Sequence, residues 1–478
     1  MQINPKEAIQ HRYLLLFPDG IGFRNFVMTD FIKHLIRDGE VVIWHAIPEK
    51  LTKSYQKQWN GKVTWFSLPP HHEGQLPFIT RRAKQMAQLY WQDEPGTEVV
   101  LEAMLSRPGS GWRGVRNRIA NSLGRVNGRS SHGVLFLNSL HQYSVRHTRY
   151  FHEYIALLRQ VKPDVVFCSH QRSEIAVPVM LAARYLGIPT VTFIYSWDNL
   201  PKGRMAVNAD YYFVWSQHMK EEMLHYYPDV REEQIFIVGT PQFEHYFNLS
   251  LLESRSDFFG RYGLDPDRKV ICFSGDDLST SPLDHEYLAD LAEALRAIPE
   301  AYRPQILFRR NPTDSIDRYR STLDRYPEIH ISDPAWVTLS QNDWTKVVPT
   351  AEDTKLLANV VHHCDIVINV GSTMALDFAI VKKPAIYLRY PPSSWNPNMK
   401  WSIEQVYRYP HYNFLPRIHP VTWVYSREDL ASTVMHVLDH PQELQSEREK
   451  WVNFLVQAPL DKVSERCAQA LQQIAGGS

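Results

Sequence analysis

The sequence has few cysteines, and no two of them are close together. Its 478 residues include four cysteines, none of them in a Cys-x-x-Cys pair. Three of the four lie in or beside apolar runs that predict strands. This pattern argues against a disulfide framework or a metal site and favours buried free thiols in a reducing cytosol. The four are Cys168, Cys272, Cys364 and Cys467.

Neither sign of charge is in excess, and long apolar runs are absent. The chain has 52 basic and 52 acidic residues, which argues against a dedicated nucleic-acid-binding protein. Nowhere do 18 apolar residues follow one another, and the start of the chain lacks the apolar core of a signal peptide. We therefore expect a cytoplasmic protein without a membrane-spanning helix, one that can still work at the inner face of the cell membrane.

Acidic residues are absent from one long stretch. Between Ala103 and His152 there is no Asp or Glu, whereas arginine recurs. One interpretation is a basic surface that docks on anionic lipid headgroups or on a phosphate-bearing acceptor, with Trp112 and Leu123 as interfacial anchors. The other is a solvated surface balanced by acidic residues elsewhere. We favour docking. The arginines are Arg107, Arg113, Arg116, Arg118, Arg125, Arg129, Arg146 and Arg149.

A strand–turn–helix–strand pattern lies in the C-terminal half of the chain. Residues 365–370 are a short β-branched, apolar run, which predicts a parallel strand covered on both faces. Residues 371–373 (Gly-Ser-Thr) break the run, helical spacing follows, and residues 385–388 predict a second strand. The pattern is therefore a βαβ unit whose turn ends at a helix N-terminus.

Such a turn suits an anion, because the first N–H groups of a helix lack intrahelical partners and the helix dipole adds positive partial charge. Gly371 would let a phosphate approach the backbone, and the hydroxyls of Ser372 and Thr373 would donate to it. Asp377 shares a helix face with Thr373 and is placed to accept hydrogen bonds from ribose hydroxyls. The alternative is that Ser372 caps the helix and Asp377 only complements its dipole.

The run from Ile368 to Asp377 (INVGSTMALD), followed by KKPAIYL, resembles the nucleotide-binding segment of glycosyltransferases of the GT-B fold. It is most similar to bacterial surface-polysaccharide enzymes and to CDP-glycerol glycerophosphotransferases. The resemblance implies an α/β fold in which two Rossmann-like domains face a cleft. It also implies that Ser372 and Thr373 hold the donor diphosphate and that Asp377 holds the ribose, although the family often has the longer Glu there.

Two more predicted strand ends in the C-terminal half are candidate parts of the donor site. In the related transferases, an Arg followed two places on by His-Pro meets donor phosphate or base. Arg309 matches this pattern, but Asn311 replaces the His, so we expect hydrogen bonding without acid–base chemistry. A surface arginine pair before a turn is the alternative. The candidate donor-binding residues at these strand ends are Gly275, Asp276, Arg309 and Asn311.

A base for the acceptor hydroxyl is expected in the N-terminal half, at the carboxyl ends of the strands, where open α/β sheets bind ligands. The candidates are Asp198 and His170, followed by Asp19. His170 has the intrinsic pKa nearest neutrality. Asp198 belongs to a Ser-Trp-Asp-Asn element that resembles the surface-polysaccharide transferases. Asp198 could instead make an Asx turn, and His170 could be a loop histidine with its hydrogen bonds satisfied.

Helices and aromatic residues give three further expectations. Helical spacing predicts one helix over residues 25–36 and another that begins after Ser173 as its N-cap and ends at Tyr185. The segment after Tyr390 is rich in aromatic residues and proline. It would form either a stacking wall for a base or sugar, or a well-packed connection.

The predicted domains are an N-terminal acceptor-binding domain over residues 1–245 and a donor-binding domain over residues 246–456. The resemblance implies that a last helix, within residues 457–478, crosses back to the N-terminal domain. The expected partners are a nucleotide-sugar donor, which is a substrate and not a cofactor, and a glycan or lipid-linked acceptor. Nucleic acid and cofactors are not expected.

The predicted function is glycosyl transfer that builds a bacterial surface polysaccharide. No Asp-x-Asp or His-Glu-x-x-His motif occurs at a suitable place, so we expect a metal-independent reaction. Two alternatives stay open. One is a hydrolysing UDP-sugar 2-epimerase, an enzyme class that shares this fold and needs several carboxylates around the sugar. The other is a catalytically silent protein that binds sugar nucleotides or glycans.

Overall fold

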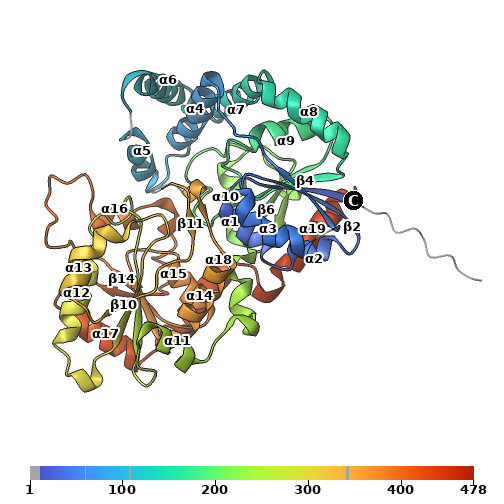
Figure 1. The fold of residues 1–478 in the computed structure, drawn as a ribbon. Coiled ribbons are helices and arrows are strands. Elements are labelled where there is room, and N and C mark those ends of the chain that lie inside the picture. Colours follow the sequence, from blue (N-terminus) through green and yellow to red (C-terminus); the bar gives the residue numbers. More distant parts are fainter. Residues whose placement is uncertain (1–10, 60, 107–108, 341–343, 478) are drawn as a thin grey trace, which may run out of the picture. The chain divides into compact units, whose positions relative to one another are not determined.

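The computed structural model of the protein describes residues 11–59, 61–106, 109–340 and 344–477 (Figure 1). Residues 1–10, where no signal peptide is predicted, and Arg107 of the predicted basic region lie outside the described residues. The chain divides into two compact units. The first contains residues 1–242 and 455–478, and the second contains residues 243–454.

The first unit is built on a sheet of seven parallel strands. They are β1 (His11–Phe17), β2 (Gly39–His45), β3 (Val63–Ser67), β4 (Val165–Cys168), β5 (Thr190–Phe193), β6 (Tyr211–Val214) and β7 (Ile235–Ile237). Residues 13–17 of β1 are fully buried, as expected for a parallel strand covered on both faces. The order is β3-β2-β1-β4-β5-β6-β7, so the direction in which the chain adds strands reverses between β1 and β4.

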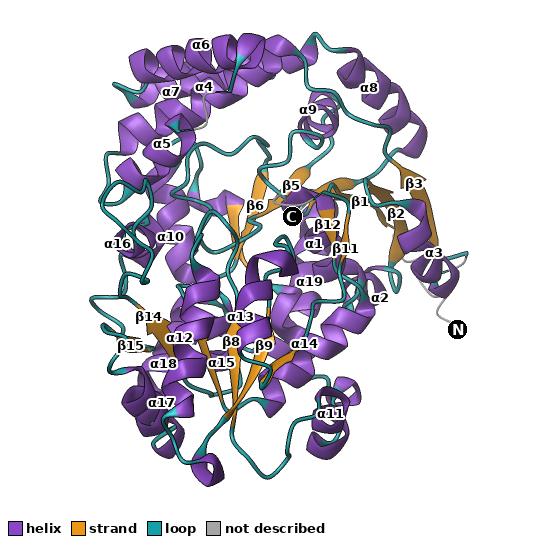
Figure 2. Ribbon diagram, turned by 60° about the vertical axis from the view of Figure 1, so that its left-hand side comes forward, coloured by secondary structure: helices purple, strands orange, loops and turns teal. Residues whose placement is uncertain are grey.

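Helices and connecting turns surround this sheet. One group, α4, α6 and α7, lies together, and α9 contacts both α7 and the strands β4 and β5 (Figure 2). The helices of the first unit are α1 (Gly20–Val27), α2 (Phe31–Leu35), α3 (Glu49–Gln58), α4 (Gln75–Gln92), α5 (Thr97–Leu105), α6 (Gly111–Asn127), α7 (Ser131–Arg146), α8 (Arg149–Val161), α9 (Val177–Tyr185), α10 (Gln217–Tyr226) and α19 (Val463–Ala475).

The single helix predicted over residues 25–36 is wrong, because the segment forms two helices, α1 and α2. Asp19 starts α1 early: its carboxylate accepts hydrogen bonds from the backbone N–H groups of Ile21 and Gly22. The break follows at Thr29, whose hydroxyl donates to the carbonyl of Asn25 at 3.0 Å, a local bond that competes with the helix.

The predicted N-cap at Ser173 is also wrong. Residues 173–176 form turns, with the N–H of Ala176 donating to the carbonyl of Ser173, and α9 begins at Val177. Pro178 explains the later start, since proline is favoured in the first turn of a helix, where its missing N–H costs nothing.

The second unit contains a parallel sheet of six strands and a short hairpin. The sheet strands are β8 (Val270–Ser274), β9 (Gln305–Arg309), β10 (Ile329–Ile331), β13 (Ile366–Asn369), β14 (Ala385–Leu388) and β15 (Thr422–Val424). The hairpin pairs β11 (Val337–Thr338) with β12 (Val347–Val348). The sheet order is β10-β9-β8-β13-β14-β15, with the reversal between β8 and β13. This is Rossmann-like topology in a second copy.

The helices of the second unit connect its parallel strands. They are α11 (Arg255–Tyr262), α12 (Asp284–Arg296), α13 (Arg320–Arg325), α14 (Ala351–His363), α15 (Met374–Ile380), α16 (Ile403–Tyr407), α17 (Leu430–Asp439) and α18 (Gln445–Leu455). Two parallel sheets in one chain confirm the predicted α/β class. All four cysteines are buried and free of disulfides, as predicted. Among the described residues, none of the helices combines the length and the apolarity that crossing a bilayer requires.

Two glycines bring α6 into close contact with α4. A Cβ atom placed on Gly124 would lie 2.5 Å from the Cβ of Met86 and 2.9 Å from the carbonyl oxygen of Ala83. One turn later, a Cβ on Gly128 would lie 2.7 Å from the carbonyl oxygen of Ala87. The backbones of α4 and α6 therefore meet through small residues, and no larger side chain fits between them.

Replacement of Gly124 by alanine tests this packing. The added methyl group would push against the backbone of α4, so we expect Gly124→Ala to lower the free energy of unfolding by about 1–3 kcal/mol. Calorimetric unfolding of the whole chain measures it. The control is Gly260→Ala in α11, where a Cβ meets no atom within 4 Å and alanine is the better helix former. Equal melting temperatures for the two variants would contradict this account.

Candidate functional site

The first candidate site lies at the carboxyl edge of the sheet in the second unit, where the strand order reverses between β8 and β13. The loops that follow these two neighbouring strands leave the sheet at the same carboxyl edge, the place where open α/β sheets bind ligands. A hydrogen bond joins them: the backbone N–H of Val370 donates to Oδ2 of Asp276 at 3.1 Å. The structure thus brings the predicted pair Gly275 and Asp276 beside the predicted turn 371–373.

The turn itself is packed from one side by an aromatic residue. Gly371 has a φ of 70°, which favours glycine, and a Cβ on it would lie 2.8 Å from the hydroxyl oxygen of Tyr412. That hydroxyl donates to the carbonyl of Gly371. Ser372 is half-buried, Thr373 is exposed, and α15 begins directly after them. The aromatic segment acts here as a well-packed connection, and backbone conformation with packing accounts for the glycine.

Asp377 lies on α15 and is hydrogen-bonded to a residue far away in the sequence. Its Oδ1 accepts a hydrogen bond from the hydroxyl of Tyr246 at 2.7 Å, and both residues are buried. This bond attaches the segment just after residue 242 to α15. Sequence analysis missed Tyr246, because it lies 131 residues from its partner and no local pattern marks it. The role of Asp377 in binding ribose stays a prediction.

Two buried carboxyl groups lie behind the loop after β8. Oδ2 of Asp284 accepts hydrogen bonds from the N–H of Asp276 at 3.0 Å and from the hydroxyl of Tyr319 at 2.8 Å. Burial raises the pKa of Asp284 to about 6, and burial together with the charge of Asp284 raises the pKa of Asp276 well above its usual range. A protonated Asp276 would repel an anion at this edge less than a carboxylate would.

Arg309 and Asn311 lie at the end of β9, next to the same loop. The N–H of Gly275 donates to the carbonyl of Arg309 at 2.8 Å. The guanidinium is buried and ion-paired: Nη2 donates to both carboxylate oxygens of Asp353, at 2.8 and 3.0 Å. Oδ1 of Asn311 accepts from the N–H and the hydroxyl of Thr313 in an Asx turn. Both side chains support local structure, and their contact with a donor stays a prediction.

The second candidate site lies at the carboxyl edge of the sheet in the first unit, where the strand order reverses between β1 and β4. Asp19 follows β1, His170 follows β4, and Oδ2 of Asp19 lies 2.7 Å from Nδ1 of His170. Both are buried, and the His170 ring stacks on Tyr195 with centroids 4.0 Å apart and planes inclined by 17°. The structure therefore makes one dyad of two residues that the sequence offered as separate candidates.

This dyad can act as a base. An ionised Asp19 is only an acceptor, so the proton of a neutral imidazole stays on Nδ1 and the lone pair is left on Nε2. The other oxygen of Asp19 caps α1, which fixes the carboxylate. A histidine oriented in this way can take a proton from a hydroxyl and is stabilised as an imidazolium by the carboxylate.

Asp198, the third candidate, follows β5 and is differently engaged. Its carboxylate forms an ion pair with Lys202, and its Oδ1 accepts from the side-chain amide of Asn199 at 2.9 Å. Asn199 in turn accepts from Gln171, whose own carbonyl oxygen accepts from the N–H of Tyr195. This network joins the loops after β4 and β5. The carboxylate of Asp198 is thus engaged by Lys202 and Asn199.

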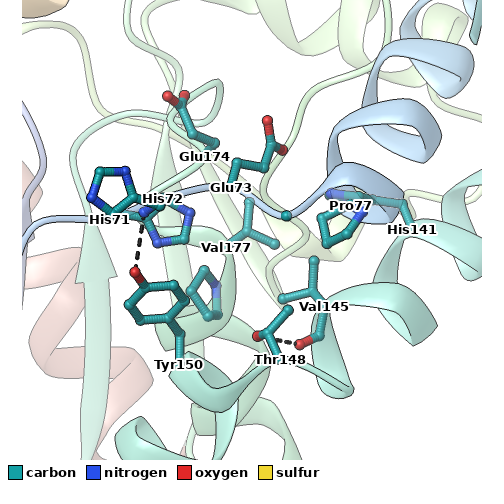
Figure 3. Close-up of a pocket in the computed structure, with 12 residues that line it drawn as sticks. His71, His72, Glu73, Pro77, His141, Val145, Thr148, Tyr150, Glu174 and Val177 are labelled. Atoms are coloured by element: carbon teal, nitrogen blue, oxygen red, sulfur yellow. Dashed lines mark hydrogen bonds between the residues drawn. The ribbon is translucent and has the colours of Figure 1, made fainter. Parts of the chain in front are cut away.

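A small pocket lies near this edge, between residues 71–74 and the helices α4, α7 and α9 (Figure 3). Glu174, from the loop that also carries His170, and Glu73 lie on the same side of it. His141 is 1% exposed, and its Nδ1 has no hydrogen-bond partner among the described residues. Burial lowers the pKa of His141 well below its usual value, so its neutral ring can accept or donate a hydrogen bond.

Comparison with known proteins shows which fold the chain has, through solved structures of low sequence identity. Neither a family model nor a curated protein matches the sequence. Among solved structures, a putative UDP-N-acetylglucosamine 2-epimerase from Listeria monocytogenes has a TM-score of 0.55 at 11% identity, over 98% of this chain and 98% of that one. UDP-GlcNAc 2-epimerase from Neisseria meningitidis, bound to UDP-GlcNAc, has 0.51 at 10%, over 97% and 100%.

A glycosyltransferase from Rickettsia africae ESF-5 is similar in the same way, with a TM-score of 0.50 and 13% identity over 98% of this chain and 100% of that one. At such identities the likeness shows the fold alone. The chain thus has the GT-B type of fold, with two Rossmann-like domains, which confirms the predicted fold class.

The buried carboxyl pair predicts how stability depends on pH. Because the folded state raises the pKa of Asp284 to about 6, it keeps a proton that the unfolded chain has already lost near pH 4. The pair therefore lowers the free energy of unfolding as the pH rises through this window. We expect Asp284→Asn to gain on the order of 1–3 kcal/mol relative to wild type between pH 4 and pH 7.

Denaturant unfolding at several pH values measures this difference. The control is Asp324→Asn, an exposed aspartate on α13, whose difference from wild type should stay constant. A constant difference for Asp284→Asn would show that its carboxyl titrates normally in the folded protein.

Proposed function

We propose that this protein is a glycosyltransferase that uses a nucleotide-activated sugar to build a bacterial surface polysaccharide or glycopolymer. The observation that carries the proposal is the dyad of Asp19 and His170, 2.7 Å apart at the strand-order reversal of the first unit. Transfer to a hydroxyl needs a base, and this dyad is built as one. The resemblance of residues 368–377 to nucleotide-binding segments supports the donor half.

The second unit would bind the donor at the edge shared by β8 and β13. The fold supports this assignment, since the structurally similar Neisseria enzyme was solved with UDP-GlcNAc. Ser372 and Thr373 would donate hydrogen bonds to the diphosphate, whose negative charge grows as the sugar leaves. Asp377 would accept hydrogen bonds from ribose hydroxyls, as the resemblance implies, beside the bond that its Oδ1 accepts from Tyr246.

The first unit would bind the acceptor, a glycan or a lipid-linked sugar, and activate its hydroxyl. Nε2 of His170 takes the hydroxyl proton as the acceptor oxygen bonds to the anomeric carbon and the bond from that carbon to the diphosphate breaks. Asp19 stabilises the imidazolium that results, and the proton then passes to water. In the neighbouring pocket, Glu174 could accept from a further acceptor hydroxyl, whereas both carboxylate oxygens of Glu73 accept from Arg81. No metal is required for these steps.

The second candidate function is a hydrolysing UDP-sugar 2-epimerase. Two of the structures with the same fold carry that name, and the segment from Ser169 to Glu174 resembles such enzymes. Against it, epimerases need several carboxylates around the sugar. At the edge of the first unit, Asp19 is bonded to His170 and Asp198 is paired with Lys202. A binding protein without catalysis is the third candidate.

Nucleotide binding is the first test. Calorimetry of the purified chain with UDP, CDP, GDP, ADP, CMP and UMP should show selective binding of one of them. We expect Asp377→Ala to weaken that binding roughly 10- to 150-fold, since the loss of charged hydrogen bonds to ribose costs roughly 1.5–3 kcal/mol. Asp324→Ala, a remote exposed aspartate of the same unit, is the matched control. Absence of binding to all six nucleotides would remove the donor site.

Product analysis tests the reaction. The radiolabelled sugar nucleotide selected above is incubated with and without a bacterial membrane fraction as the acceptor source. Label in glycan or lipid supports transfer, a free 2-epimer released without acceptor indicates the epimerase, and intact donor indicates a binding protein. Asp19→Asn keeps an oxygen to cap α1 but turns His170 to the wrong tautomer. We expect it to lower kcat roughly 10²–10⁴-fold at unchanged nucleotide affinity.

A further inference from the structure

Helix α6 exposes its large apolar residues to solvent, whereas an ordinary surface helix buries them against the core. The residues it buries are small or polar: Gly114, Asn117, Ala120 and Gly124. Four large apolar residues are exposed instead, with exposed fractions of 64, 43, 37 and 62%. These residues, here called the α6 stripe, are Trp112, Ile119, Leu123 and Val126.

The stripe is a continuous line on the helix. Its members are spaced by seven, four and three residues, a pattern that places them on one face at 3.6 residues per turn. Gly124 and Gly128 lie on the opposite face of α6, and their close contact with α4 keeps that face turned toward α4. Rotation that would bury the stripe is therefore blocked, because α4 and α6 meet closely only through glycine. Contiguous exposed apolar residues of this kind mark an interaction surface.

Positive charge flanks the stripe. Arg118 and Arg125, seven residues apart, lie together on one side of it and are exposed. On the other side, Arg116 lies over the ring of Phe78, with its guanidinium carbon 3.8 Å from the centroid. No acidic residue occurs from Ala103 to His152, so neither α6 nor α7 carries a negative charge of its own. The surface combines an apolar line with exposed arginines.

We propose that α6 is an interfacial helix with which the first unit docks on an anionic lipid surface. A bilayer offers both complements in one plane: acyl chains for the stripe and negative headgroups for the arginines. A helix of this length runs about 25 Å and can lie flat in the headgroup region. Trp112 and Leu123 anchor it as the sequence indicated, and Ile119 and Val126 extend the contact. The proposal does not depend on the transferase activity.

Vesicle co-sedimentation of the full chain tests the proposal. One set of vesicles contains 30% phosphatidylglycerol in phosphatidylcholine, and the other contains phosphatidylcholine alone. We expect binding to the anionic vesicles, weakened by high salt. Trp112→Ser with Val126→Ser should reduce the partition coefficient at least tenfold, since two apolar side chains no longer leave water. Arg118→Gln with Arg125→Gln should reduce it about fivefold per arginine at low salt.

Matched controls come from the same unit. Tyr185→Ser removes an aromatic residue that is 62% exposed on α9, and Arg37→Gln removes an exposed arginine far along the chain from α6. Both should bind vesicles as wild type does. All replaced side chains are exposed, so melting temperatures should stay within about 2 °C of wild type, which excludes unfolding as the cause.

Three results would overturn the proposal: no binding to anionic vesicles, equal binding to both vesicle types, or unchanged binding by both double variants. Light scattering after gel filtration tests the other possible partner of the α6 stripe, a second copy of this chain. A wild-type dimer that becomes a monomer on Trp112→Ser with Val126→Ser, without vesicle binding, would assign the stripe to a second copy. Nucleotide affinity is measured on the same proteins. Absence of nucleotide binding by the wild-type chain would count against the proposed function, and the vesicle result would be judged separately.

Discussion

The burial of parallel strands on both faces is the constraint on which this molecule depends. When helices cover both faces of a parallel sheet, polar side chains can reach a ligand only from the loops at the carboxyl ends of the strands. In each sheet, the direction in which successive strands are added reverses between two neighbouring parallel strands. These neighbours are β1 and β4 in one sheet and β8 and β13 in the other. In both units these reversals are where hydrogen-bonded polar residues gather. The sites thus follow from the topology before any residue is assigned a role.

Local pattern was enough to predict the strands β13 and β14, the turn at 371–373 and the burial of the cysteines, because each depends on a few consecutive residues. It was not enough for the pairs Asp19–His170 and Tyr246–Asp377, whose members lie 151 and 131 residues apart. Such pairs depend on which strands become neighbours. The early start of α1 was accessible in principle, since an aspartate directly before a helix, such as Asp19, is a common cap.

The two edges differ in chemical character. The edge of the first unit presents an imidazole whose orientation is fixed by a carboxylate and by stacking on Tyr195. At the edge of the second unit, Arg309 is paired with Asp353, and burial raises the pKa of Asp284 and of Asp276. Several residues there, such as Gly371 and Asp377, also hold the fold together. The first edge is suited to proton transfer, and the second to holding a ligand without opposing its charge.

The return of the chain to its first unit has a consequence for synthesis. Helix α19 packs on α2 and on the strands β1 and β4, with Cys467 and Leu471 fully buried. A ribosome delivers these residues after the whole second unit has emerged. The second unit is continuous in sequence and can fold as it leaves the ribosome, whereas the first must wait with one side of its sheet uncovered. The first unit is therefore begun before the second unit is made and completed after it.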